Sequence, residues 1–491
     1  MLKKFLISLI STLIITATIP LATYACTTVL VGKDATVDGS TIIARNEDAK
    51  TAWTKRFVVI PSETFKDGAM YVSKGNGFTY PMPKETLKYT ATPDWDQSAG
   101  NYYEDGINTN GVCVSATESA SANEKALKAD PLVENGIGED SITTILLGRA
   151  KTAREGAELL GKIIETKGAS EVNGTIISDK NEIWYVENGS GHHWVARRVP
   201  DDCYAVIPNK LVIGNVDLND TKNFLGSKDL IEFAKANGLY NDKTDGGFSF
   251  KLAYGTDNEE DAKYNYPRMW DGQRILTPSK DQKITSHDFE TFLKPDKKVS
   301  VNDVKTVLRS HFDGTPYDSF GEYKDHYRPI SVPQTMESHI LQCKQNLPKE
   351  VGCIQYLALG VSDRSTYVPF YSGITETPKD YQKGTDKPDN ESAYWTYRKA
   401  AAMTKPYYDK FQGMYTKPLS TALEAKLDEE LDKNTEHFTD LVKKDPKKAS
   451  EEMNKYTEKM ANYAQEKTKE LNDKLIVATT AQTPVKHNSK L

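Results

Sequence analysis

The chain has 491 residues and a formal net charge of −6, with acidic and basic residues well mixed along its length. This length is enough for one large core or for two or three domains. The sequence has no basic stripe, which argues against nucleic acid as a partner. Its eight histidines show no metal-ligand spacing and its five cysteines form no CxxC pair, so we expect no metal and no other cofactor.

The first 25 residues have the pattern of a secretory signal peptide. Two lysines precede an apolar run that Pro20 breaks, and small residues occupy the −3 and −1 positions of a cleavage site, at Thr23 and Ala25. An uncleaved membrane anchor is the alternative, because the apolar run is close to spanning length. We expect cleavage by signal peptidase, which would leave a mature chain without a stable membrane anchor, secreted from a bacterium or held at its surface.

Strand patterns follow the leader directly. The pattern is strand-like from Cys26 through Val31, the sequence KDATVDGS is typical of a turn, and TIIARNEDA (41–49) follows as a second strand, which together predict two antiparallel strands. The segment EDGINTNGVCVSATES repeats this theme with a Gly/Asn turn and a short strand. Apolar residues at helical spacing from Ile142 to Ile164 predict a helix or a helix pair that Asp140 or Ser141 caps and that ends at Gly168. Several further strands are expected between residues 173 and 217.

The order of the predicted elements favours the α+β class. Strands, then helices, then strands again occur without regular βαβ alternation, which argues against a doubly wound parallel sheet. From about Pro418 the chain becomes charged and helical, and Pro446 separates two amphipathic helices. We therefore expect a main domain over 26–417, a helical hairpin over 418–475 that packs on it, and a flexible tail over 476–491.

The cysteines raise two separate questions. Cys343 and Cys353 are close in sequence and could pair in an oxidising compartment, or they could remain buried thiols, and the sequence leaves both open. Cys26 stands directly after the predicted cleavage site. As a new N-terminal residue it would carry a free α-amine with an ordinary pKa of about 7.7 to 8.0, close enough to neutrality to take the proton from its own thiol.

Arg45 and Asp48, in the sequence ARNED, lie near the end of the strand that returns beside Cys26. An arginine would lower the pKa of a neighbouring thiol, and a carboxylate could bind the N-terminal ammonium. The pattern alone favours an ordinary surface turn with a salt bridge between the two residues.

The Cys-Thr start, the Gly-Ser turn and ARNED resemble the cysteine dipeptidases of the dipeptidase A (PepD-like) family, which belong to the N-terminal nucleophile hydrolases. Further matching motifs follow in the family's order, namely DGINTNGVCVSATES, GSGHHWVARRVPDDCYAVIPN and YPRMW. The resemblance implies an αββα sandwich of two antiparallel sheets between helix layers. It also implies attack by the Cys26 thiol on a dipeptide carbonyl and a thioester that water hydrolyses.

The resemblance also assigns site residues. Cys26 matches the nucleophile, Arg45 an arginine set against it, and Asp48 a carboxylate near its amine. Asn209 falls where the wider superfamily places an asparagine beside the amine and thiol, and Arg268 falls where it places a further arginine.

Other positions are less closely specified. Related acylases carry a side-chain oxyanion donor in the region that Thr117 or Glu118 occupies here, so a backbone N–H is expected to serve instead. A dipeptidase must also bind both charged ends of its substrate. Glu118, ahead of Glu187, is the candidate for the amine, and His193 and Arg268 are the candidates for the carboxylate. Sister enzymes are often multimers, which leaves a homo-oligomer open.

Two other functions remain open at this point. Penicillin V acylases and bile-salt hydrolases share the Cys-Thr opening, so an amidase acting on acyl amides is the first. The second is a lipid-anchored surface binding protein, because bacterial lipoproteins also place a cysteine directly after the leader. The residues before Cys26 argue against this second function, because Thr23 and the bulky Tyr24 fit a lipidation signal poorly.

Overall fold

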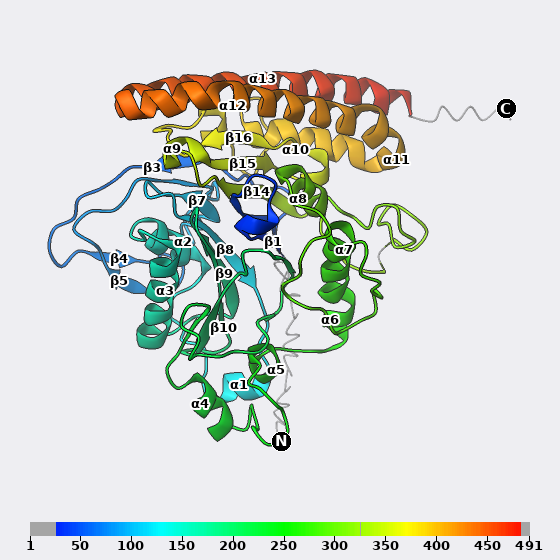
Figure 1. The fold of residues 1–491 in the computed structure, drawn as a ribbon. Helices are drawn as coiled ribbons and strands as arrows, with labels where there is room; N and C mark the ends of the chain where they lie inside the picture. The colour runs from blue at the N-terminus through cyan, green and yellow to red at the C-terminus, as the bar shows by residue number, and fades with distance from the viewer. Residues whose placement is uncertain (1–25, 325, 483–491) are drawn as a thin grey trace, which may run out of the picture.

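The computed structural model describes residues 26–324 and 326–482 (Figure 1). The predicted signal peptide at 1–25 and the last part of the predicted tail, 483–491, lie outside the described residues. Within the described ranges, no helix combines the length and the apolar character that a membrane span requires.

Two six-stranded sheets form the centre of the fold, and every strand pair in them is antiparallel. The first has the order β12-β1-β2-β14-β15-β16 and consists of β1 (Thr27–Val31), β2 (Thr41–Asp48), β12 (Tyr204–Ile207), β14 (Thr335–Cys343), β15 (Cys353–Leu359) and β16 (Val368–Tyr371). The second has the order β13-β11-β10-β9-β8-β7 and consists of β7 (Asp105–Ile107), β8 (Cys113–Ser119), β9 (Asn173–Ser178), β10 (Ile183–Asn188), β11 (Trp194–Arg198) and β13 (Phe224–Gly226).

The expected pair of strands after the leader is confirmed. β1 and β2 are antiparallel neighbours, and every residue in both is buried. Strands covered on both faces read as continuous apolar runs rather than as strict alternation, which matches TTVLV and the first half of TIIARNED. The charged second half of β2 is buried as well, and its side chains form part of the site described below.

One apolar cluster lies between the two sheets. It combines Leu30 and Ile43 from the first sheet with Ile176 and Tyr185 from the second. The opposite face of the second sheet packs on α2 (Glu139–Leu147) and α3 (Ala153–Lys167). The opposite face of the first sheet packs on α8 (Val301–Leu308), α10 (Ala393–Thr404), α12 (Lys417–Lys444) and α13 (Pro446–Ala481). The chain therefore has the expected mixture of helices and antiparallel sheets.

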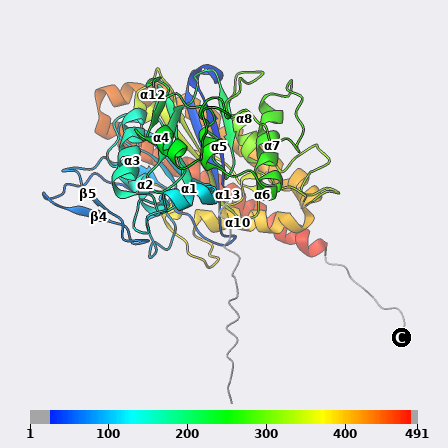
Figure 2. The same cartoon turned by 90° about the horizontal axis from the view of Figure 1, so that it is seen from below.

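The remaining elements surround these sheets. Two small ribbons, β3 (Val58–Ile60) with β6 (Tyr89–Ala91) and β4 (Met70–Val72) with β5 (Thr79–Pro81), follow β2, and the β4–β5 ribbon projects from the body (Figure 2). The shorter helices are α1 (Glu124–Ala129), α4 (Leu230–Ala236), α5 (Phe250–Tyr254), α6 (Glu259–Tyr264), α7 (Tyr266–Leu276), α9 (Lys349–Gly352) and α11 (Tyr408–Phe411).

The helical segment over 139–167 is a pair of helices, one of the two forms that the sequence allowed. α3 begins after Thr152, whose side chain accepts a hydrogen bond from the backbone N–H of Glu155. It ends at Gly168, whose φ of 78° lies in the left-handed region that a residue with a Cβ adopts only at a cost.

The two C-terminal helices cover the first sheet across the top of Figure 1. α13 runs to Ala481, so the expected start of a flexible tail at residue 476 is wrong. The last turns remain helical because Leu475 and Ala478 pack against Phe411 of α11, a contact that local sequence cannot reveal.

The structure also answers the question about the cysteines. Cys343 and Cys353 lie directly opposite each other on β14 and β15 and form a disulfide. The thiol sulfur of Cys113, on β8 of the other sheet, lies 3.4 Å from the disulfide sulfur of Cys343.

Candidate active site

The strand register places the predicted nucleophile beside the predicted arginine. Cys26 immediately precedes β1, where Thr28 lies opposite Arg45 of β2, and Arg45 lies opposite His339 of β14. Residues directly opposite each other in an antiparallel sheet point to the same face. All three side chains contact β8 of the second sheet, through Glu118 or Ser115.

Arg45 contacts the thiol of Cys26 at the start of β1. Its guanidinium donates a hydrogen bond of 3.1 Å to Sγ of Cys26, and both side chains are buried. The same guanidinium pairs with Glu104 at 2.7 Å and donates to Ser115 Oγ at 3.0 Å and to the carbonyl of Thr117 at 2.9 Å. These contacts fix the orientation of Arg45, so its charge points at the sulfur without rearrangement.

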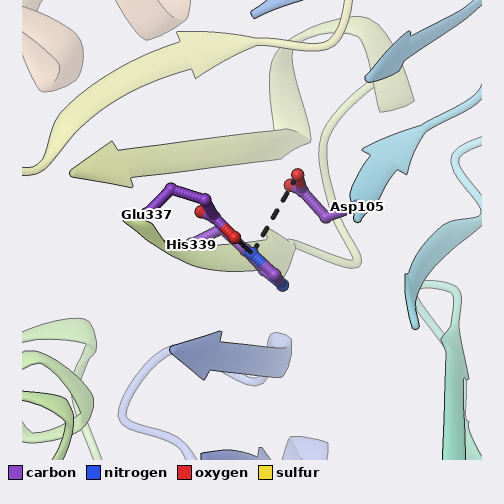
Figure 3. A group of neighbouring side chains, drawn as sticks. All are labelled: Asp105, Glu337 and His339. Atoms are coloured by element: carbon purple, nitrogen blue, oxygen red, sulfur yellow. Dashed lines mark hydrogen bonds and ion pairs between the residues drawn. The ribbon is translucent and has the colours of Figure 1, made fainter. Parts of the chain in front are cut away.

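A hydrogen-bond network under Arg45 contains Asp105, Glu337 and His339, which come together from β7 and β14 (Figure 3). Nδ1 of His339 is 2.8 Å from Glu337 Oε1 and Nε2 is 2.8 Å from Ser115 Oγ. The Asp105 carboxylate accepts hydrogen bonds from the side chains of Thr92 and Gln355. Because most of the possible metal-ligand atoms already have these partners, we interpret the group as support for Arg45 rather than as a metal centre.

The surroundings of the Cys26 thiol favour its protonated form. Burial raises its pKa well above the usual value, and although Arg45 acts in the opposite direction, the nearby Glu118, Asp48 and Glu139 raise it further. Among the described residues, no histidine contacts Sγ. Burial lowers the pKa of His339 to about 4, and its ring nitrogens contact Ser115 and Glu337. The contacts of His339 therefore do not make it a base for this thiol.

Arg268 and Asn209 contact the backbone at the head of β1. The buried guanidinium of Arg268, on α7, donates hydrogen bonds to the carbonyl oxygen of Cys26 and to Thr27 Oγ1, the latter at 2.9 Å. It also donates to Asn209 Oδ1 at 2.7 Å, and Asn209 donates to the carbonyl of Ser119 at 2.9 Å. The two residues predicted by resemblance thus fix the position of Cys26 through its main chain.

Asp48 ends β2 next to the site. Its carboxylate accepts hydrogen bonds of 2.5 Å from Arg328 and from Thr335. Its pKa is raised because burial outweighs the opposing effect of Arg328. The alternative of an Arg45–Asp48 surface salt bridge is wrong, because both residues are buried and pair with other groups.

Glu118 lies beneath the nucleophile strand. It accepts a hydrogen bond of 2.8 Å from Thr28, its other carboxylate oxygen has no partner among the described residues, and burial raises its pKa to about 7. The carboxyl group is thus close to Cys26, but its side chain is fully buried and does not line the cavity that opens at the thiol.

Two predicted substrate-binding residues lie elsewhere, so those predictions need correction. Glu187 is two strands away from Glu118, and its carboxylate accepts the backbone N–H groups of Val212 and Ile213. His193 contacts Asp130 at 2.8 Å and stacks on Phe233. Both side chains are buried in structural contacts and stand outside the lining of the Cys26 cavity, because β10 carries Glu187 and the turn between β10 and β11 carries His193 away from Cys26.

A cavity of about 300 Å³ opens at Cys26. Its walls come from the ends of β2 and β8, the start of β14, the loop before β7, the first residue of α2 and the segment that precedes β9. The lining is mainly acidic and includes Glu47, Asp48, Asp94, Asp96, Glu104, Glu139 and Glu171. Lys50, which is exposed and lies 3.5 Å from the ring centroid of Trp53, adds a basic group.

Sequence reasoning missed most of this acidic lining. Glu47 lay inside the motif ARNED, and register alone places it on the same face as Arg45, two residues along β2. Glu104, Glu139 and Glu171 come from three separate segments, and only the packing of those segments brings them to one cavity.

Comparison with known proteins places this site in a family. Residues 25–418 match the sequence profile of Peptidase family C69. The chain belongs to peptidase family C69. It is 42% identical over 426 residues to a "Probable dipeptidase" of Latilactobacillus sakei, which covers 85% of this chain and 89% of that protein. It is 39% identical over 411 residues to a "Dipeptidase" of Bifidobacterium longum, which covers 77% of each chain.

The resemblance to the dipeptidase A family is thereby confirmed. A "Probable dipeptidase A" of Streptococcus pyogenes is 37% identical over 392 residues, which cover 78% of this C69 chain and 84% of that protein. The expectation that the chain is an enzyme of the peptidase type is likewise confirmed.

Proposed function

We propose that this C69 peptidase is a secreted dipeptidase whose nucleophile is the thiol of Cys26, exposed as the N-terminus when signal peptidase removes residues 1–25. Its relatives carry the name dipeptidase, and the segment that matches the family begins beside Cys26. The observation that carries the proposal is the placement of Cys26 on a small acidic cavity with its sulfur hydrogen-bonded to the buried Arg45.

The proposed chemistry supplies a base for the Cys26 thiol, whose pKa burial raises. The free α-amine of Cys26, adjacent to Sγ within the same residue, takes the thiol proton, and Arg45 stabilises the thiolate. Sulfur forms a bond to the substrate carbonyl carbon, the C–N bond breaks, and the ammonium returns the proton to the departing amine. Water, activated by the same α-amine, then hydrolyses the thioester, which releases the N-terminal amino acid of the substrate and regenerates the free thiol.

Arg268 and Asn209 are positioning residues in this mechanism. Arg268 contacts the carbonyl oxygen of Cys26, and Asn209 ties Arg268 to the end of β8. They would keep the new N-terminus at the cavity once the leader has gone. Asp48 lines the same cavity at the end of β2, where it is available to the ammonium of Cys26.

The proposed fold is the αββα sandwich of the N-terminal nucleophile hydrolases. It is supported by the apolar cluster shared between the two sheets and by the helices whose side chains pack on their outer faces. In that arrangement β1 and β2 are central strands of one sheet, which gives Cys26 a rigid support.

The two alternative functions fit the site less well. Lipid attachment would place Cys26 at the surface, whereas its sulfur contacts Arg45 inside the molecule. An amidase for uncharged acyl groups would favour an apolar cavity, whereas this lining carries many carboxylates. A dipeptide, with a charged amine beside the scissile carbonyl, suits this lining better.

The direct test uses mature protein that begins at Cys26. Cys26→Ser should reduce dipeptide hydrolysis by orders of magnitude, Cys26→Ala should abolish it, and a rapid quench of wild type should reveal an acyl adduct by mass. Cys203→Ser is the matched control, because Cys203 is also a free, buried thiol but does not line the cavity. Unchanged turnover in Cys26→Ala would exclude the mechanism, and a panel that includes N-acyl amides would detect an acylase.

A further inference from the structure

Three carboxylates on the Cys26 cavity form no ion pair among the described residues, namely Asp96, Glu139 and Glu171, and of these Asp96 accepts the backbone N–H of Ser98 in its own loop. Glu104 pairs with Arg45, Glu47 and Asp94 pair with Lys55, and Asp48 pairs with Arg328. Glu139 and Glu171 line the same cavity, yet in the described part of the chain neither forms an ion pair with a lysine, arginine or histidine. The two residues contact each other within the cavity wall, because the backbone N–H of Glu139 donates a hydrogen bond of 2.5 Å to Glu171 Oε1.

The pair is linked to Cys26 through three hydrogen bonds in series. Glu139 Oε1 accepts the backbone N–H of Thr117 at 3.3 Å. The carbonyl of that same Thr117 accepts from Arg45, whose guanidinium also donates to Cys26 Sγ. The carboxylate of Glu139 is close enough to raise the pKa of the Cys26 thiol. In a dipeptide, one Cα atom separates the amine from the carbonyl that the thiol attacks, so the amine would lie within reach of this wall.

A second observation also indicates a missing donor. Glu47 lines the cavity and is only 6% exposed, and its carboxylate Oε2 has no hydrogen-bond partner among the described residues. A buried carboxylate oxygen without a partner is costly, and a bound donor would remove that cost. Asn46, the residue before Glu47, lies opposite Thr27 in the pairing of β2 with β1. Glu47 and Cys26 are therefore neighbours at the end of this strand pair, and both line the cavity.

We propose that Glu139 and Glu171 bind the protonated α-amine of the substrate and thereby restrict this peptidase to peptides with a free N-terminus. The proposal rests on the proposed function of the site. It replaces Glu118 and Glu187, the residues favoured from sequence, with two that the cavity brings together. The ammonium supplies the positive charge and the N–H donors that the pair lacks.

Electrostatics agree with this assignment. Burial raises the pKa of Glu139 to about 8, and the neighbouring Glu104 and Glu171 add to the rise while Arg45 opposes it. Burial likewise raises the pKa of Glu171. A bound ammonium would favour the ionised forms of both groups, so part of the cost of burying the pair is recovered only in the complex.

The test compares two substrates that share one scissile bond, a dipeptide and its des-amino analogue. Wild type should prefer the dipeptide by about 100-fold in kcat/KM, as expected for a charge-assisted contact. Glu139→Gln and Glu171→Gln should each reduce kcat/KM for the dipeptide about 10- to 100-fold, chiefly through KM, and leave the des-amino analogue nearly unchanged. Asp140→Asn is the matched control, since it removes the neighbouring charge on α2, whose carboxylate contacts Ser73 and Ser141 instead of the cavity.

The outcomes separate this proposal from the proposed function. If Cys26→Ala retains dipeptide turnover, the proposed function fails whatever the glutamates do. If wild type hydrolyses dipeptides but both glutamine variants keep its preference for the amine, the amine site is wrong and the function stands. Calorimetric binding of the intact dipeptide to Cys26→Ala, with and without each glutamine substitution, gives the answer independently of turnover. Equal affinities there would also overturn the amine site.

Discussion

The substitution Arg45→Lys gives a quantitative prediction, because lysine keeps the positive charge but lacks the planar guanidinium group with its several N–H donors. The guanidinium meets six acceptors, on Cys26, Ser115, Glu104, Ala116 and Thr117. A lysine ammonium has three donors, so at least three buried acceptors would lose their partner. At about 1 kcal/mol or more for each, Arg45→Lys should destabilise the fold by roughly 3 kcal/mol.

The same substitution should slow catalysis by a separate amount. Loss of the charge-assisted contact to Sγ is worth about 1.5 to 3 kcal/mol, which corresponds to a decrease of roughly 10- to 150-fold in kcat. Denaturant unfolding measures the first effect and steady-state hydrolysis by the folded variant measures the second. Arg309→Lys is the control, because Arg309 binds Glu424 bidentately on the outer side of the first sheet, so it should lose stability and keep kcat. A folded Arg45→Lys variant with wild-type kcat would refute the role given to this residue.

Three further predictions concern neighbouring groups. Arg268→Met should lower kcat with little change in KM, because it removes a hydrogen bond to the carbonyl of Cys26 and no contact with the substrate. Steady-state kinetics with one dipeptide measures this, and a change confined to KM would contradict it. Cys353→Ser should lower stability by about 2 to 4 kcal/mol without loss of activity, measured by unfolding under oxidising conditions, and equal stability would argue against the disulfide. Glu118→Gln should raise stability at pH 8 but not at pH 4. The folded state binds this proton more tightly than the unfolded chain, with a pKa raised to about 7, so the wild type loses stability as pH rises from about 4.5 to 7. A pH-independent effect on the unfolding free energy would contradict that reasoning.

The part of the site that could be predicted is the part encoded locally. Cys26, Arg45 and Asp48 lie within one strand pair, and the register of a short antiparallel pair follows from its turn. The positions of Arg268 and Asn209 near the start of β1 were predicted only through the family resemblance. Arg268 comes from α7, far along the chain, and no local pattern brings it to Cys26.

The acidic wall was not predictable in the same way. Glu139 is the first residue of α2, where a carboxylate usually has the ordinary role of complementing the helix dipole. Its place on the cavity depends on how α2 packs against β8, a contact between segments that follow separate patterns. His193 illustrates the converse, because its motif matched the family although it lies in the turn between β10 and β11, which are two and three strands away from β8.

The end of the C-terminal hairpin was misplaced for a related reason. Ile476 and Val477 are largely exposed, so the amphipathic pattern fades after Leu475 and predicts the end of the helix. The helix continues because contacts on its other side, with α11, stabilise the last turns.

The central claim is that removal of the leader creates the catalytic base at Cys26. The most direct measurement compares the protein that begins at Cys26 with the same protein carrying one additional residue, Ala25, in front. Both retain the thiol and Arg45, and they differ in whether the nitrogen of Cys26 is an amine or an amide. We predict dipeptide hydrolysis by the first and loss of nearly all turnover in the second, with mass spectrometry confirming that Ala25 stays in place. Equal turnover in the two proteins would contradict the account.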